Sequence, residues 1–150
     1  MTHRFVVIGS NSFSGSHFIQ HLLQENYEVI GVSRSEELHS VFLPYRWGKT
    51  ELINYRFYQM DLNHDLQALM QIIKDFQPEY VVNFAAQGMV AQSWQTPEHW
   101  YQTNVVGQVQ FHDQLRKCSF LKKYVHVTTP EAYGSMEGWT KEHFHFAPST

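Results

Sequence analysis

The chain has 150 residues and a formal net charge of −3, with 43% hydrophobic and 17% charged residues. That length and composition fit one globular domain with a buried core and exclude a disordered chain. The charge provides no basic surface for nucleic acid and no polybasic membrane anchor, and the single cysteine, Cys118, excludes a disulfide framework.

The first half of the chain alternates between apolar runs and a helical pattern. A β-branched run predicts a strand over residues 5–9, and apolar residues at helical spacing predict a helix over residues 15–25. A second strand is predicted over residues 28–32. Residues 33–49 are less regular, and because a proline and a glycine interrupt them we expect a short helix there at most.

The same alternation continues in the second half. Strands are predicted over residues 55–59, 80–85 and 124–128, and helices over residues 64–76 and 97–118. Strands that alternate with helices form a parallel sheet covered on both faces, and right-handed crossovers wind it in both directions. We therefore predict an α/β fold, a doubly wound parallel sheet of the Rossmann type with about five strands.

A glycine-rich turn joins the first predicted strand to the first predicted helix. Gly9 permits a tight turn, Gly15 lets the helix pack close to the strand, and the free amides at the helix start can face a pyrophosphate. An ordinary loop with two glycines is the alternative. The candidate cofactor ligands in this turn are Gly9, Asn11, Ser12, Phe13, Ser14 and Gly15.

Residues 7–17, Val-Ile-Gly-Ser-Asn-Ser-Phe-Ser-Gly-Ser-His, resemble the opening of the extended short-chain dehydrogenases/reductases. The pattern of that family is Gly-x-x-Gly-x-x-Gly, and the resemblance implies a nicotinamide cofactor, NAD(P). Ser12 occupies the position of the middle glycine of this pattern, where the backbone normally approaches the phosphate. Its hydroxyl is expected to donate a hydrogen bond there.

The end of the second strand bears on the choice between NAD and NADP. An NAD enzyme usually offers a carboxylate here to the ribose 2′-hydroxyl, but this chain has Ser33 and then Arg34. Because Arg34 can pair with a 2′-phosphate, the sequence favours NADP. A solvated arginine beside Glu36 and Glu37 is the alternative.

Two later segments complete the expected cofactor site. In the family an acidic residue after the third strand contacts the adenine amino group, which implies this role for Asp61, followed by Leu62. A helix cap is the alternative for Asp61. Ala85, Ala86 and Gln87 lie in a stretch that resembles the family's Asn/His-x-Ala-Ala-Gln, where small side chains let the strand end lie against the cofactor.

Two polar residues between the fourth and fifth strands are candidates for the active site. Asn104 begins the segment Asn-Val-Val-Gly, which matches the family's Asn-Val-x-Gly on the long helix. The resemblance implies that Asn104 supports the active site and that Ser93 contacts the substrate. A capping or packing role is the alternative for each of them.

Residues 127–134, Val-Thr-Thr-Pro-Glu-Ala-Tyr-Gly, resemble the Ser-Thr-(Asp/Ser)-Glu-Val-Tyr-Gly of nucleotide-sugar 4,6-dehydratases. The resemblance implies that Thr129 binds the sugar O4 and that Glu131 removes the C5 proton, which becomes acidic once C4 is a ketone. Pro130 departs from this pattern, because dTDP-glucose dehydratases have an aspartate there and GDP-mannose dehydratases a serine.

The implied function is that of the N-terminal, NAD(P)-binding part of a nucleotide-sugar 4,6-dehydratase of the GDP-mannose or dTDP-glucose type. Such an enzyme oxidises C4, deprotonates C5 and removes water from C6. A UDP-glucuronate decarboxylase or a nucleotide-sugar epimerase is an alternative within the fold, and a non-catalytic nucleotide-binding module is an alternative of another class. The parent enzyme is expected to bind a nucleotide-sugar and to form a homodimer through its long helices.

Hydride transfer in this family needs a Tyr-x-x-x-Lys pair after the fifth strand. The one such spacing here, Tyr45 and Lys49, falls before the substrate half and is taken as a coincidence. Residues 141–150 resemble the family segment that runs into Pro-Tyr. We therefore expect residues 1–150 to be a dinucleotide-binding domain truncated before the catalytic helix and the substrate domain, and inactive by itself.

Two further features concern location and metals. The apolar run at residues 5–8 is too short for a signal peptide or a membrane span, which favours a cytoplasmic protein. The histidine pair His17 and His21 and the pair His143 and His145 are closely spaced, but neither has a third ligand at a suitable spacing. No metal site is therefore expected.

Overall fold

The computed structural model describes residues 2–48, 52–136, 138–142 and 145–148, and within them one parallel sheet is formed. Its strands are β1 (Arg4–Ile8), β2 (Glu28–Ser33), β3 (Tyr55–Gln59), β4 (Tyr80–Asn83) and β5 (Lys123–His126). Their order across the sheet is β3-β2-β1-β4-β5. The chain extends outward from β1 in both directions, which confirms the predicted doubly wound α/β fold.

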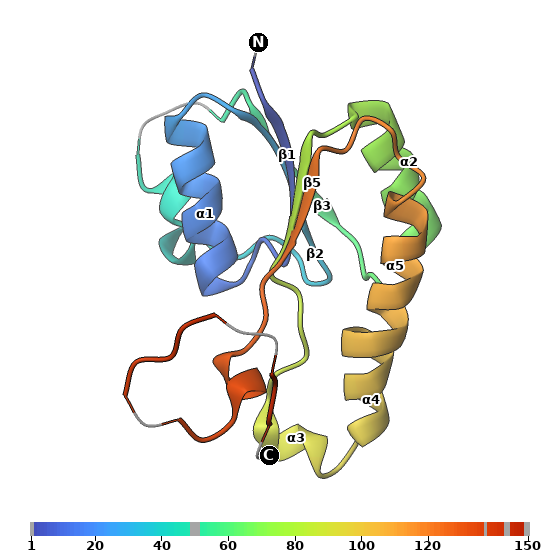
Figure 1. The fold of residues 1–150 in the computed structure, drawn as a ribbon. Coiled ribbons are helices and arrows are strands. Elements are labelled where there is room, and N and C mark those ends of the chain that lie inside the picture. The colour runs from blue at the N-terminus through green and yellow to red at the C-terminus, as the bar shows by residue number, and fades with distance from the viewer. Residues whose placement is uncertain (1, 49–51, 137, 143–144, 149–150) are drawn as a thin grey trace.

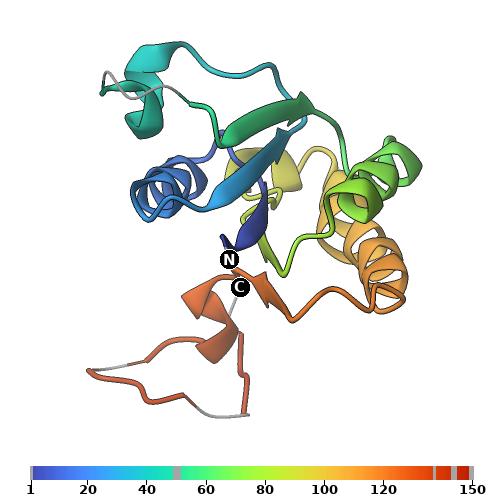
Figure 2. The same ribbon diagram turned by 90° about the horizontal axis from the view of Figure 1, so that it is seen from above.

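Helices cover both faces of this sheet (Figure 1). One face carries α1 (Phe13–Gln24), and the other carries α2 (Leu66–Phe76) and α5 (Gly107–Leu115). The view from above shows the sheet between these two layers (Figure 2). The remaining helical elements are short: η1 (Ser40–Phe42), η2 (Pro44–Arg46), α3 (Val90–Ser93), α4 (Pro97–Tyr101), the π-helical η3 (Gln102–Val106) and η4 (Pro130–Tyr133).

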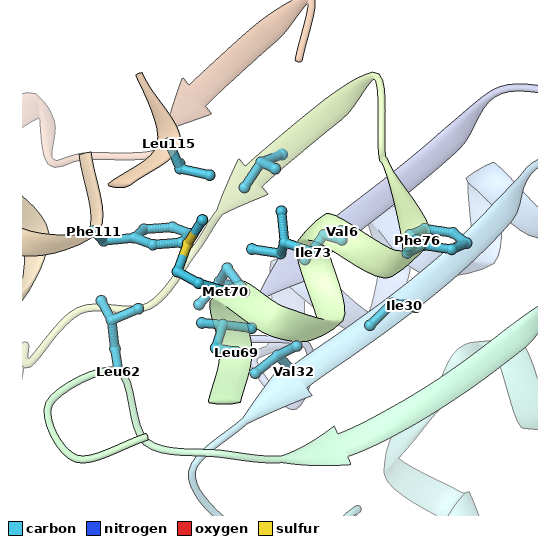
Figure 3. Packing of buried hydrophobic residues seen from close by; sticks show 12 residues of the cluster. Val6, Ile30, Val32, Leu62, Leu69, Met70, Ile73, Phe76, Phe111 and Leu115 are labelled. Carbon is cyan, nitrogen blue, oxygen red and sulfur yellow. The ribbon is translucent and has the colours of Figure 1, made fainter. Parts of the chain in front are cut away.

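Alternate residues of the strands supply two hydrophobic cores, one on each face of the sheet. On one face Val7 packs with Ile19 of α1. On the other face Val6 packs with Ile73 of α2 and Phe111 of α5. All five side chains are fully buried, and Figure 3 shows the second of these cores. Because helices cover both faces, the inner strands are apolar along most of their length, as the sequence pattern indicated.

The long helix predicted over residues 97–118 is interrupted in the structure. It begins at Pro97 as α4, passes through the π-helical turn η3 and ends at Leu115 as α5. A π-helical turn accommodates an extra residue per turn and occurs frequently at functional sites. The apolar spacing of the sequence does not distinguish such a turn from regular α-helix.

Several other boundaries differ from those predicted by a few residues, and two of them have a side-chain cause. Helix α1 begins at Phe13 because the Ser12 hydroxyl accepts a hydrogen bond from the amide of Gly15 and caps the helix. Strand β4 ends at Asn83 because the side-chain oxygen of Asn83 accepts a hydrogen bond from the amide of Ala85. That amide is then unavailable to continue the strand ladder.

The C-terminal part of the chain is irregular. The described residues that follow η4 form neither helix nor strand. Some positions singled out from the sequence, namely Lys49, His143 and part of the match at residues 141–150, lie outside the described residues. Among the helices that the structure describes, none is both long and apolar enough to cross a lipid bilayer.

Candidate functional site

A cleft of about 320 Å³ opens at the carboxyl ends of the strands, beside the turn that follows β1. The strand order reverses between β1 and β4, and this is the position where doubly wound sheets bind their ligands. The cleft is lined by these residues singled out from the sequence: Gly9, Asn11, Ser12, Arg34, Asp61, Leu62, Ala85, Ala86 and Gln87. Phe13, Ser14 and Gly15 form the first turn of α1, directly after Ser12.

Gly9 allows the turn after β1 to lie against the end of β4. Its φ angle is +79°, and a Cβ atom built on it would lie 2.7 Å from the amide nitrogen of Ala85 and 2.8 Å from the carbonyl carbon of Phe84. A Cβ atom at Gly15 would collide with the carbonyl oxygen of Gly9. Only glycine fits at these two positions, so the turn has the close backbone approach that a pyrophosphate site requires.

The Ser12 side chain stabilises this turn from within. Its hydroxyl donates a hydrogen bond to the carbonyl of Gly9 at 2.7 Å and accepts one from the amide of Gly15 at 3.0 Å. The hydroxyl proton is therefore directed into the turn, in contrast to the expected bond to a phosphate. No acidic residue stands in the first turn of α1, which leaves the positive end of the helix dipole available to an anion.

The end of β2 places Ser33 and Arg34 in different environments. The Ser33 hydroxyl is buried and accepts hydrogen bonds from the amide of Asn11 at 3.0 Å and from the Ser10 hydroxyl at 3.3 Å. Arg34 is exposed and lines the cleft, and its guanidinium forms no ion pair with any residue that the structure describes. The carboxylate of Glu37 pairs instead with Arg46 at 2.5 Å.

The Asp61 side chain stabilises the turn that follows β3. One carboxylate oxygen accepts a hydrogen bond from the amide of Asn63 at 2.8 Å, which caps the turn before α2. The amide of Asp61 donates to the carboxylate of Asp65 at 2.8 Å. Asp61 also lines the cleft. The N-cap of α2 is Asp65, so Asp61 caps the preceding turn and not the helix itself.

A buried polar network fixes the end of β4. The side-chain nitrogen Nδ2 of Asn83 donates a hydrogen bond to the side-chain oxygen of Gln108 at 2.8 Å and another to the hydroxyl of Tyr124 at 3.0 Å. The Tyr124 hydroxyl in turn lies 3.0 Å from Nδ1 of His126. Burial raises the pKa of Tyr124, while burial and the neighbouring charge of His112 lower the pKa of His126. This network connects β4, α5 and β5 directly behind the cleft.

Asn104 lies in the π-helical turn η3 and holds the chain after β4. Its side-chain oxygen accepts a hydrogen bond from the amide of Gln87 at 2.8 Å, and its side-chain nitrogen donates to the carbonyl of Gln87 at 2.9 Å. The neighbouring Thr103 lines the cleft. The π-helical turn therefore supplies both a wall of the cleft and the support for one of its predicted ligands.

The three residues expected to contact the substrate lie outside the cleft. The Ser93 hydroxyl donates to the carbonyl of Val90 at 2.6 Å within α3. Thr129 and Glu131 are exposed at the carboxyl end of β5, where the Thr129 hydroxyl accepts a hydrogen bond from the amide of Glu131 at 3.2 Å. Pro130 occupies the first position of η4, a place where its fixed φ angle fits.

The sequence of this chain matches the profile of the family described as GDP-mannose 4,6 dehydratase over residues 6–150. The chain belongs to this family. Curated relatives include the GDP-mannose 4,6-dehydratase of Vibrio cholerae serotype O1, 29% identical over 88% of this chain and 36% of that protein. A probable dTDP-glucose 4,6-dehydratase of Sinorhizobium fredii is 32% identical over 89% of this chain and 39% of that protein. The chain thus spans less than half the length of these relatives.

Solved structures agree with membership of the GDP-mannose 4,6 dehydratase family. The dTDP-glucose 4,6-dehydratase of Bacillus anthracis, crystallised with NAD, superposes with a TM-score of 0.78 at 27% identity and covers 99% of this chain and 45% of that one. The UDP-glucose 4-epimerase of Thermotoga maritima, crystallised with UDP-glucose, gives a TM-score of 0.73 at 27% identity over 91% of this chain and 41% of that one.

Several residues of the cleft in this family member were not singled out from the sequence. Met60 and Phe84 are neighbours of Asp61 and Ala85, and proximity to a strand end was the signal that would have identified them. Ser35 follows Arg34 directly, but it carries no charge, and it was therefore not singled out as a phosphate ligand. Thr103 comes from a helix distant in sequence, and no local pattern indicated its position.

Proposed function

We propose that this chain forms the nicotinamide-dinucleotide-binding region of a nucleotide-sugar 4,6-dehydratase. The observation that carries the proposal is the cleft at the switch point of the sheet, where Gly9 brings a helix-capping turn against Ala85. The free amides at the start of α1 suit a pyrophosphate, and Asp61, which lines the cleft, would accept a hydrogen bond from an adenine amino group. The residues present therefore fit a dinucleotide.

NADP is the cofactor that the cleft favours. A carboxylate at the end of β2 would accept hydrogen bonds from a ribose 2′-hydroxyl and would repel a 2′-phosphate. This chain has Ser33 there, with its hydroxyl committed to the turn, and the exposed guanidinium of Arg34 lies next to it. An arginine without an ion-pair partner in the described part of the chain suits a phosphate, because its planar fork binds phosphate oxygens in pairs.

The proposed reaction uses Thr129 and Glu131 on the sugar. Both lie after β5 on the carboxyl edge of the sheet, the same edge as the cleft. Bound NADP would accept hydride from C4 of the sugar and would return it to C6 once water has been lost. The Thr129 hydroxyl would then orient O4, and the Glu131 carboxylate would remove the proton from C5 as the 6-hydroxyl leaves. Pro130 has no proton to give, so the leaving hydroxyl would take its proton from another group.

We further propose that residues 1–150 alone do not catalyse this reaction. The tyrosine of the one Tyr-x-x-x-Lys spacing, Tyr45, is 6% exposed on the α1 face of the sheet. Its hydroxyl donates to Glu37 at 3.0 Å and is hydrogen-bonded to the hydroxyl of Tyr55 at 3.1 Å. A buried tyrosine with these partners does not reach a substrate. Hydride transfer would therefore need a tyrosine other than Tyr45.

Epimerisation is the second candidate, because relatives of this chain include the UDP-glucose 4-epimerase of Neisseria gonorrhoeae, 29% identical over 88% of this chain. Glu131 favours dehydration, since a 4-epimerase needs no base for the C5 proton. Extending the chain to the length of its relatives and supplying nucleotide-sugars would separate the two. A 4-keto-6-deoxy product supports dehydration, and a C4 epimer contradicts it.

We also propose that the parent enzyme is a homodimer that uses the helices after β4. Val105, Val106 and Val109 expose 50%, 41% and 63% of their surface on η3 and α5. Such an apolar stripe on a helix is suited to a second copy of the chain. Light scattering of a full-length protein would give twice the chain mass if the proposal holds and the chain mass if it fails.

Cofactor titration tests the central proposal. NADPH and NADH would be titrated into the 150-residue chain by calorimetry, and we expect NADPH to bind more tightly. Arg34→Ala should reduce this preference by about tenfold or more, as loss of a charge-assisted hydrogen bond does. Arg116→Ala, at the exposed C-cap of α5, is the matched control and should change neither affinity. A folded sample that binds neither cofactor would overturn the proposal.

A further inference from the structure

Asn11 connects the turn after β1 to the segment after β2. Its side-chain nitrogen donates to the carbonyl of Glu36 at 2.7 Å, to the hydroxyl of Ser35 at 2.9 Å and to the carbonyl of Ser35 at 3.3 Å. Its backbone amide donates to the Ser33 hydroxyl at 3.0 Å. One residue of the glycine-rich turn thus contacts positions on both sides of Arg34.

The orientation of the Asn11 amide follows from its neighbours. Three oxygen acceptors of Ser35 and Glu36 surround the nitrogen, and an amide turned the other way would direct its oxygen at all three. The oxygen Oδ1 is buried and accepts no hydrogen bond from the described residues. The hydrogen bonds of the Asn11 side chain to described residues therefore all go to Ser35 and Glu36, which follow Arg34 directly.

Other residues fix the same segment from the opposite side. The carboxylate of Glu37 accepts hydrogen bonds from the Tyr45 hydroxyl at 3.0 Å and from Arg46 at 2.5 Å. The carbonyl of Arg34 accepts a hydrogen bond from the side chain of Gln59 at 3.2 Å. The backbone around Arg34 is thus anchored before, at and after this residue, while its guanidinium projects from an exposed position beside the cleft.

We propose that Asn11 is a positioning residue that makes the site selective for the 2′-phosphate of NADP. By holding Ser35 and Glu36, Asn11 fixes the backbone from which Arg34 extends. A fixed backbone lowers the conformational entropy that a long cationic side chain loses when it binds a phosphate. The inference rests on the proposed function, because it assumes that a dinucleotide occupies the cleft.

The selectivity for NADPH over NADH is the measurement that tests this role. In Asn11→Ala the affinity for NADPH should fall by about three- to tenfold more than the affinity for NADH, as expected for lost hydrogen bonds that act through Arg34. The same substitution in an Arg34→Ala background should have no further effect on NADPH, because Asn11 acts through Arg34. A purely structural role for Asn11 would not produce this pattern.

Two further variants and one direct measurement complete the test. Ser35→Ala removes one of the three acceptors and should give a smaller loss of NADPH affinity than Asn11→Ala. Asn54→Ala, at an exposed asparagine before β3, is the matched control and should leave both affinities unchanged. NMR order parameters of the backbone at residues 34–37 should fall in Asn11→Ala, with or without cofactor.

The outcomes separate this inference from the proposed function. Equal losses of NADPH and NADH affinity in Asn11→Ala would overturn the inference and leave a dinucleotide site in place. Unchanged order parameters at residues 34–37 would also overturn it, because Asn11 would then not anchor the segment. A folded wild-type chain that binds neither cofactor would overturn the proposed function, and the role of Asn11 with it.

Discussion

The side chain of Asn104 pairs with both backbone groups of Gln87, 17 residues earlier in the chain. Its oxygen accepts from the Gln87 amide at 2.8 Å and its nitrogen donates to the Gln87 carbonyl at 2.9 Å. The Asn104 side chain thus pairs with the N–H and the C=O of Gln87, as the backbone of a neighbouring strand would do. These two hydrogen bonds hold the loop after β4 at the wall of the cleft. Asn104 therefore supports that loop.

Asn104→Ala should weaken both cofactors alike. The substitution removes two hydrogen bonds from Gln87, and the loop that carries Ala85 and Ala86 loses its outer anchor. We expect the affinities for NADPH and NADH to fall together by about three- to tenfold, in contrast to the selective effect of Asn11→Ala. Asn104→Asp keeps the acceptor and should retain part of the affinity. Unchanged affinities in both variants would show that the pairing does not support the cleft.

Gly9→Ala should destabilise the fold, because the φ angle of +79° and the nearby backbone of Ala85 leave no room for a Cβ atom. The expected loss in free energy of unfolding is about 1–3 kcal/mol, measured by urea denaturation. Gly88→Ala is the matched control, since a Cβ there meets no atom within 4 Å. It should change stability by less than about 0.5 kcal/mol. Equal effects of the two substitutions would contradict the close approach.

Ile73→Ala should be strongly destabilising, since Ile73 is 0% exposed on the buried face of α2. Removing a buried isoleucine side chain costs about 2–5 kcal/mol, depending on how far the cavity collapses. Ile53→Ala, at a side chain that is 80% exposed, should change stability by about 0.5 kcal/mol or less. Denaturation midpoints that coincide for the two variants would place Ile73 outside the core.

The acid side of the stability profile should depend on Glu79. Hydrogen bonds from Lys122 and from His3, the latter at 2.6 Å, lower the pKa of Glu79 from 4.5 to about 2. Because the folded pKa is depressed, the stabilising contribution is complete above about pH 4.5 and is lost as the pH falls towards 2. Glu79→Gln should therefore have a lower melting temperature than wild type at neutral pH, and the difference should shrink over this interval.

Salt and a second glutamate provide the controls for Glu79. The Lys122 side chain is 60% exposed, so added salt should reduce the difference between wild type and Glu79→Gln. Glu142→Gln, at an exposed position in the irregular C-terminal part, should melt as wild type does at every pH. If the difference in melting temperature between wild type and Glu79→Gln stays constant from pH 6 to about pH 2, these contacts do not stabilise the ionised form of Glu79.

The order and type of the elements followed from the sequence because they depend on local patterns. β-branched runs such as residues 5–9 marked the strands, helical spacing marked α1 and α2, and their alternation fixed a doubly wound parallel sheet. Gly9 and Gly15 were also identified locally, since a strand followed by a glycine turn and a helix is a short-range signal.

The tertiary structure decided which polar side chains meet. Asn11 reaches Ser35 across 24 residues, and Asn83 reaches Tyr124 across 41. These pairs exist only after the order β3-β2-β1-β4-β5 brings the strand ends together, and no local periodicity encodes them. The burial of Tyr45 against Tyr55 has the same origin. Hydrophobic spacing therefore determined the scaffold, whereas hydrogen bonds between residues distant in sequence determined how the cleft is built, because their geometry depends on the packed backbone.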